Sequence, residues 1–236
     1  MNHIDTQGLV LRRSDYGEFD RMVTLLTPDL GRVEVLARGC KRTKSPLKNA
    51  AELFTTGSFH LYRTARDRFT LEQCTITESF LPLRADLDRL TTGVYWLKLC
   101  YQLTQSGVPA DPVFSYAVRA LAYLCYSDSD AAFLTMLYEA RMLSLTGFQP
   151  VTERCASCGK PLDGRAFFAP KQGGTLCAEC AGYAGEISIE ARRILYRACR
   201  AGMDKLLPLE SDEAWREAAK FVSAYAGTQI KAGRIG

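Results

Sequence analysis

Four cysteines in the second half of the chain restrict its fold more than any other feature of the sequence. They form two Cys-x-x-Cys pairs with 18 residues between them, in a glycine-rich segment. Structural Zn²⁺ takes four ligands in a tetrahedron, and two such pairs at this separation are typical of a zinc site. Four sulfurs complete the coordination shell, so the spacing predicts a structural site with no position for a catalytic water. The predicted ligands are Cys155, Cys158, Cys177 and Cys180.

Other chemistries are compatible with cysteine pairs. An iron–sulfur cluster also takes four thiolates, although the ribbon spacing favours zinc. A redox-active pair, Cys155 and Cys158, would make the protein a thiol-based oxidoreductase. Such pairs usually stand in a thioredoxin-like βαβ context, whereas this one follows a helical stretch and Pro150. The five remaining cysteines lie mostly in apolar segments, where we expect small buried hydrophobic residues rather than disulfides.

Composition and the histidine count exclude several classes of protein. Hydrophobic residues make up 47% of the 236 residues, charged residues make up 24%, and no run of about 18 apolar residues would span a membrane. The N-terminus lacks the layout of a secretory signal, so we expect a cytoplasmic protein. The two histidines, His3 and His60, stand in no recognisable catalytic motif. We therefore predict no catalytic residues.

The pattern of apolar residues changes near residue 81. Before it, short alternating runs separated by turn residues predict five strands, enough for a small closed or nearly closed barrel. After it, apolar residues recur every three or four positions and predict helices. Strands followed by helices favour an α+β chain over a doubly wound sheet. The predicted strands are 8–13, 21–26, 32–37, 58–63 and 69–76, and the predicted helices are 86–105, 112–126, 130–147, 187–205 and 214–231.

This pattern also suggests a domain organisation. We predict a strand domain over residues 1–80 and a helical domain over residues 81–236. The cysteine-rich stretch, residues 150–183, would be an insertion within the helical domain.

Positive charge gathers in one short stretch, residues 32–48, which we call the basic segment. It carries a net charge of +5 in 17 residues, more than the +4 of the whole chain. A second group of arginines surrounds the turn between the last two predicted strands. Such side chains on a barrel displace counterions from phosphates, so we predict nucleic-acid contacts. The predicted contact residues are Arg38, Lys41, Arg42, Lys44, Lys48, Arg63, Arg66 and Arg68.

Two weaker features accompany the basic groups. Three aromatic residues of the predicted strands, Phe59, Tyr62 and Phe69, belong either to the core or to a surface where a base could stack. On the predicted helix over 187–205, a stripe of three arginines is either an ordinary solvated face or a site for an acidic partner. The stripe consists of Arg193, Arg197 and Arg200.

Several blocks of residues, in this order, resemble the bacterial RecO family of recombination mediators. The N-terminal blocks are Gly8-Leu9-Val10-Leu11, Tyr16-Gly17-Glu18-Phe19-Asp20, Thr27 to Gly31, Ala37-Arg38-Gly39 and Lys44-Ser45. The later blocks are Gly147-Phe148-x-Pro150, Cys155-x2-Cys158-Gly159 and Gly173-Gly174-x2-Cys177-x2-Cys180. Some RecO proteins lack the four cysteines, and this chain keeps all of them.

The resemblance implies a fold and a function. The N-terminal barrel would be an OB-fold, followed by a helical domain with a zinc-ribbon-like insertion that carries the four cysteines. RecO proteins are not enzymes in the bond-breaking sense: they bind single- and double-stranded DNA, anneal complementary strands and assist RecA loading on DNA coated with single-stranded DNA-binding protein (SSB). The implied partners are DNA, RecR, RecF and the acidic C-terminal tail of SSB, and the implied location is the nucleoid. The alternative is an RNA-binding factor that combines an OB-fold with a zinc ribbon.

Overall fold

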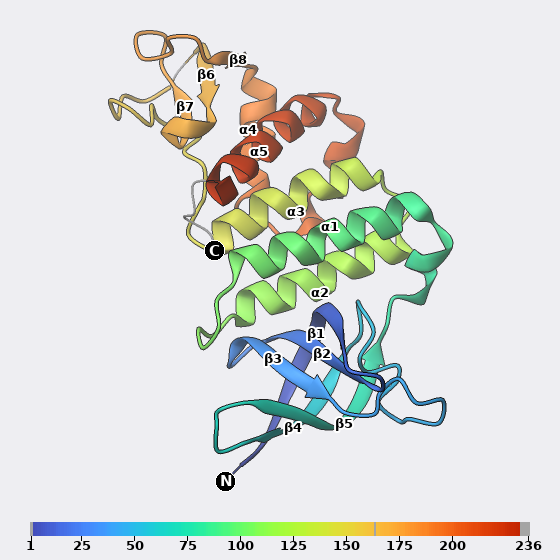
Figure 1. Cartoon of the computed structure of the whole chain (residues 1–236). Coiled ribbons are helices and arrows are strands. Elements are labelled where there is room, and N and C mark those ends of the chain that lie inside the picture. Colours follow the sequence, from blue (N-terminus) through green and yellow to red (C-terminus); the bar gives the residue numbers. More distant parts are fainter. Residues whose placement is uncertain (1, 163, 232–236) are drawn as a thin grey trace. The chain divides into compact units, whose positions relative to one another are not determined.

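The computed structural model describes residues 2–162 and 164–231. It divides the chain into two compact units, Met1–Tyr126 and Ser127–Gly236. The first unit holds a β-barrel followed by two helices, and the second holds three helices and a small sheet (Figure 1). The predicted α+β class is confirmed.

The first five strands close into a barrel with the spatial order β1-β2-β3-β5-β4. All neighbouring strands are antiparallel except β3 and β5, whose short parallel contact closes the barrel. A small closed barrel of five strands matches the OB-like architecture that the resemblance implies. All five predicted strands are present, and each covers at least the residue range that the sequence predicted for it. Their bounds are β1 His3–Tyr16, β2 Asp20–Thr27, β3 Gly31–Ala37, β4 Thr56–Arg63 and β5 Phe69–Glu78.

Apolar side chains from every strand fill the barrel. On β3, Val33 and Val35 are buried while Glu34 between them is exposed, as a period of two requires. The long connection from β3 to β4, residues 38–55, adds its own apolar side chains to the same core. These are Cys40, Leu47, Ala50 and Ala51.

Two helices complete the first unit, α1 Leu87–Leu103 and α2 Asp111–Tyr126, after a short 3-10 turn, η1 Leu81–Ala85. Asp86 caps α1, because its carboxylate accepts a hydrogen bond from the backbone N–H of Arg89. Both helices were predicted from their apolar period, and their bounds differ from the prediction by two residues or fewer.

A glycine allows the loop between α1 and α2 to lie against the barrel. Gly31 begins β3 with a φ of +64°, and a Cβ there would lie 2.2 Å from the carbonyl oxygen of Val108. This close approach lets the backbone N–H of Arg32 donate to the carbonyl of Gln105 at 3.0 Å. Any larger residue at this position would displace the helical loop from the barrel.

The second unit contains helices α3 Ala131–Leu145, α4 Ile189–Ala198 and α5 Ala214–Lys231, with 3-10 turns η2 Pro170–Gln172, η3 Met203–Lys205 and η4 Leu207–Ser211. As predicted, Asp130 caps α3, because its side chain accepts from the first backbone N–H groups of the helix.

The predicted helix over 187–205 is wrong at both ends. Ile187 belongs to a strand, and the following Ser188 is the N-cap of α4, since its hydroxyl accepts from the backbone N–H of Ala191. The helix ends at Ala198, and Gly202 then precedes a short 3-10 turn. The apolar period continues through these breaks because residues on both sides of the helix, such as Ile187 and Met203, are also buried.

A small sheet, formed by the cysteine-rich stretch and the residues just after it, was not predicted. Its order is β7-β6-β8, and both pairings are antiparallel. Phe168 of β6 is buried, with its ring 5.0 Å from that of Phe221 on α5, which attaches the sheet to the helices of the same unit. The strand bounds are β6 Ala166–Ala169, β7 Gly174–Leu176 and β8 Gly185–Ile187.

Across the described residues, no helix combines the length and apolar character needed to span a membrane.

Candidate functional site

The structure brings the four predicted metal ligands together. The Sγ atoms of Cys155, Cys158, Cys177 and Cys180 all lie within 4.8 Å of one another. The Sγ atoms of Cys158 and Cys177 are 3.8 Å apart. A regular tetrahedron with Zn–S distances of about 2.3 Å has edges of about 3.8 Å. The cluster could therefore hold a metal ion, and its donor set is consistent with a zinc site.

The backbone around the first pair of cysteines prepares one sulfur for metal binding. Burial raises the pKa of Cys155, but nearby backbone N–H groups, including that of Cys158, outweigh burial and lower this pKa to about 6. Thiols around Cys180 act in the opposite direction and raise its pKa to about 12. Like charges at this spacing oppose ionisation of all four thiols together, and a cation among them would remove that opposition.

The two cysteine pairs are joined outside the sulfur cluster. The ammonium of Lys160, two residues after the first pair, lies 2.7 Å from a carboxylate oxygen of Glu179, inside the second pair. Gly159 takes a φ of +76° directly after Cys158, where the backbone turns. These features form a compact turn that holds the sulfurs on one side.

The basic segment continues into the β3–β4 connection, residues 38–55, which folds as a series of tight turns. Backbone N–H groups donate to carbonyls three residues earlier, as from Arg42 to Gly39 at 3.1 Å and from Ser45 to Arg42 at 3.0 Å. Its apolar residues, such as Leu47, enter the barrel core, whereas its basic residues remain at the surface. The charges are thus attached to a packed structure rather than to a free loop.

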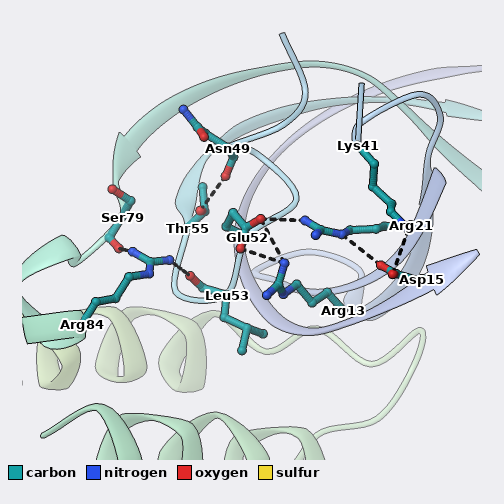
Figure 2. Close-up of polar contacts among 10 residues, drawn as sticks. All are labelled: Arg13, Asp15, Arg21, Lys41, Asn49, Glu52, Leu53, Thr55, Ser79 and Arg84. Atoms are coloured by element: carbon teal, nitrogen blue, oxygen red, sulfur yellow. Dashed lines mark hydrogen bonds and ion pairs between the residues drawn. The ribbon is translucent and has the colours of Figure 1, made fainter. Parts of the chain in front are cut away.

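A network of ion pairs fastens this connection to the first two strands, as Figure 2 shows. Glu52 accepts from Arg13 of β1 at 2.9 Å and from Arg21 of β2 at 2.6 Å. Asp15 of β1 contacts Arg21 at 3.3 Å and Lys41 at 2.8 Å. Hydrogen bonds from Lys41 and Arg21 lower the pKa of Asp15. The network therefore holds both ends of the connection against the β1–β2 hairpin.

The predicted contact residues of the basic segment differ in whether their charged groups already contact another side chain. Lys41 is committed to Asp15, and the guanidinium of Arg42 lies 5.1 Å above the ring of Phe19. Three other basic residues of this segment have exposed side chains that form no ion pair with any of the described residues. These three are Arg38, Lys44 and Lys48.

The second predicted group of arginines lies at the turn between β4 and β5. Arg63, Arg66 and Arg68 are exposed in the β4–β5 turn, and Arg63 forms an ion pair with Asp67 that raises the pKa of the arginine. This turn follows Tyr62, which pairs with His3 at the beginning of β1. The basic segment borders the other side of this turn, because Val35 of β3 pairs with Phe69, the residue after Arg68. The turn therefore lies beside the strand that leads into the charged residues from Arg38 onward.

The three aromatic residues near this turn have different environments. Phe59 is buried in the barrel core, so it is not available to stack on a base. Tyr62 and Phe69 are half-buried, and Phe69 packs against the core on one side.

The three arginines predicted as one stripe are all exposed, but only Arg193 and Arg197 belong to α4, because the helix ends at Ala198. Arg200 follows the helix and is paired with Glu153 at 3.0 Å. Beside the stripe, Arg193 lines a cavity of about 270 Å³ together with residues that the sequence did not single out. Two of them hold buried polar atoms without a hydrogen-bond partner within the described part of the chain. These atoms are Thr152 Oγ1 and Arg192 Nη1.

A basic and aromatic groove between β1 and α1 was also missed. Its volume is about 460 Å³, and its lining includes Arg12, Lys98 and Tyr101. The guanidinium groups of Arg12 and Arg32 both lie over the ring of Tyr101, 4.5 Å and 3.9 Å from its centroid. The helical period places Tyr101 on the apolar stripe of its helix. The only sequence feature that indicated this groove is the position of Lys98 one turn before Tyr101, which places a basic and an aromatic side chain on the same helix face.

The five-stranded barrel with its surface cations, the helical region and the four-cysteine cluster place the chain in a class of OB-fold proteins. The comparisons with known proteins identify the family. Residues 1–80 match the model described as Recombination protein O N terminal, and residues 84–234 match Recombination protein O C terminal. The chain belongs to the RecO family.

Its relatives support this assignment along the whole chain. The DNA repair protein RecO of Anaeromyxobacter sp. (strain K) is 31% identical over 245 residues, covering 100% of this chain and 96% of that protein. The protein of the same name from Bacillus pumilus is 29% identical and covers 97% of this chain and 91% of its own length. That of Pelotomaculum thermopropionicum is 34% identical over 177 residues, covering 75% of this chain and 68% of that protein.

Proposed function

We propose that this protein is a recombination mediator that binds single- and double-stranded DNA, anneals complementary strands and assists RecA loading on SSB-coated DNA. It acts by binding and not as an enzyme. The observation that carries the proposal is the set of exposed cations held on the barrel by the packed β3–β4 connection. Residues 1–80 are the proposed nucleic-acid-binding domain, and residues 81–236 the helical domain.

The proposed mechanism is electrostatic. Two DNA strands repel each other, and a basic surface that neutralises phosphates on both lowers this repulsion. Because Arg38, Lys44 and Lys48 are exposed and not engaged in ion pairs within the described residues, they are the side chains best placed to do this. Contacts of this kind position a strand without reading its bases, so binding should show little sequence preference.

Zinc is the proposed metal of the four-cysteine cluster, in a structural role. The cluster supplies four soft ligands at tetrahedral spacing, and when bound the ion would neutralise thiolates and join the two cysteine pairs. The insertion over residues 150–183 would then depend on the metal for its fold.

Protein partners follow from the family and from surface charge. RecR and RecF are proposed partners, with action in the cytoplasm at the nucleoid. For the acidic C-terminal tail of SSB, the proposed surface is the arginine stripe of Arg193, Arg197 and Arg200. The adjoining cavity supports it, since Arg192 and Arg193 both line this cavity and supply positive charge for a carboxylate.

A strand-annealing assay tests the central proposal. Complementary oligonucleotides, one carrying a fluorophore and one a quencher, are mixed at low salt with and without the protein. We expect faster annealing with the native protein and slower annealing when three free cations are removed together, as R38A/K44A/K48A. The matched control, K171A/K205A/K220A, removes three exposed lysines of the second unit. Equal rates with and without the native protein would refute the proposed function.

A further inference from the structure

The only two histidines of the chain, 57 positions apart in sequence, lie side by side on the outside of the barrel. The ring centroids of His3 and His60 are 5.5 Å apart, and the rings are stacked. Glu72 lies with them: its Oε2 atom is 2.9 Å from Nδ1 of His3 and 3.5 Å from Nε2 of His60. All three belong to the first unit, whereas the four cysteines belong to the second.

Strand register explains how three distant residues meet. His3 and Asp5 point to the same face of β1 because they are two residues apart, and Asp5 pairs directly with His60 of β4. Between β4 and β5 the register shifts: His60 pairs with Gln73, whereas the next residue, Leu61, pairs with Leu71. Glu72 is left as the extra residue of a β-bulge.

The bulge gives Glu72 its direction. Leu71 before it is buried in the core, and Glu72 and the residue after it are both exposed, so the alternation of the strand is broken at this point. Bulges re-aim side chains and occur frequently beside functional sites. Here the irregularity directs a carboxylate toward two imidazoles.

The spacing of the three atoms matches the ligands of one metal ion. A tetrahedral ion with bonds of about 2.05 Å to nitrogen and oxygen has ligand–ligand distances of about 3.3 Å. The measured distances of 2.9 Å and 3.5 Å lie on either side of this value, and all three ligand atoms lie within 4.8 Å of one another.

A fourth residue orients one of the imidazoles. Oδ1 of Asp5 lies 2.5 Å from Nδ1 of His60. When Nδ1–H donates to this carboxylate, Nε2 carries the lone pair and faces Glu72. Metal-binding histidines almost always have such a partner on the second ring nitrogen, where it fixes the tautomer and increases ligand basicity.

We propose that His3, His60 and Glu72 bind a divalent transition-metal ion, with Asp5 as the positioning residue of His60. Imidazole and carboxylate donors favour Zn²⁺, Ni²⁺ or Cu²⁺ over Mg²⁺ or Ca²⁺. Two neutral imidazoles and two carboxylates also balance the charge of such an ion. Three protein ligands leave a position for solvent, and the bound ion would join β1, β4 and β5 at the beginning of the barrel.

Nuclear magnetic resonance of the imidazole nitrogens provides a direct test, because the chain has only two histidines. The full-length protein is produced without a histidine tag, labelled with ¹⁵N-histidine and saturated with zinc at its cysteine cluster. Zn²⁺ is then added. We expect one further equivalent to shift Nδ1 of His3 and Nε2 of His60 together, and the same equivalent to appear by isothermal titration calorimetry.

Three variants separate a built site from surface binding. We expect E72Q to abolish the joint shift and D5N to weaken Zn²⁺ binding by about 10- to 100-fold, since Asp5 acts only through His60. The control D29N removes an exposed carboxylate in the β2–β3 turn and should leave affinity unchanged. Amide spectra verify that each barrel is folded. The proposal is refuted if only one imidazole responds, if neither does, or if E72Q binds as tightly as the native protein.

Discussion

Removal of the free cations of the basic segment should change how DNA binding depends on salt. Each phosphate contact to a single strand contributes about −0.7 to the slope of log affinity against log salt concentration. If Arg38, Lys44 and Lys48 each neutralise one phosphate, the triple alanine variant should have a slope smaller in magnitude by about 2. Between 50 mM and 200 mM salt, the native protein should then lose about 20-fold more affinity than the variant.

The structure also ranks two lysines of this segment. Lys41 is bound to Asp15 at 2.8 Å, so a phosphate contact from Lys41 requires the loss of an ion pair, whereas Lys44 is exposed and free of one among the described residues. We therefore expect K44A to reduce the slope by about 0.7 and K41A to reduce it by less.

Fluorescence anisotropy of a labelled oligonucleotide at five or more salt concentrations measures these slopes. The control triple variant of the second unit, which loses the same charge, should retain the native slope if the contacts are local. An unchanged slope in R38A/K44A/K48A would show that these side chains do not contact phosphates. Equal effects of K41A and K44A would show that the ion pair with Asp15 does not limit Lys41.

Three further predictions concern the cysteines and the anchoring network. C158S should lower the zinc content, measured by mass spectrometry, and should unfold the insertion, measured by loss of its amide signals, because structural zinc binding is coupled to folding; native metal content would contradict this. Burial raises the pKa of Cys74 to about 11 and that of Cys199 to about 12, so both should resist iodoacetamide at pH 8 in the folded protein, as peptide mapping would show. Hydrogen bonds from Lys41 and Arg21 lower the pKa of Asp15 in the folded protein. The stabilisation that this carboxylate contributes is therefore complete above its unfolded pKa of about 3.9 and is lost as the pH falls through the lower folded pKa. K41M should raise the pKa of Asp15, as a carboxyl titration followed by NMR would show.

The basic segment illustrates how far local patterns predict a functional surface. Its charge is evident from composition, and its exposure follows from the cost of burying charged groups. Its rigidity is not evident, because the anchors Glu52, Arg13 and Arg21 come from three parts of the chain. An unanchored segment of the same composition would bind phosphates with a larger entropy cost.

Local sequence determined most of the regular elements and the cluster of four cysteines. Strand alternation predicted five strands, Asp86 and Asp130 marked two helix starts, and the cysteine spacing identified a quartet that the structure brings together. Each of these depends on interactions within a turn, a hairpin or a short ligand loop. Their physical causes therefore act between residues that are near in sequence.

Only the tertiary structure decided which distant residues share a surface. Closure of the barrel and a single shift in strand register place His3, His60 and Glu72 together, and the same closure places the strand of the basic segment beside the beginning of β5, directly after the arginine-rich turn. A one-residue shift in the register between two strands would move the outward-facing side chains of one strand into the core. The barrel core therefore sets the register, and the register decides which outward-facing residues are neighbours. The alternating pattern shows that a residue points outward, but not which other residues lie beside it.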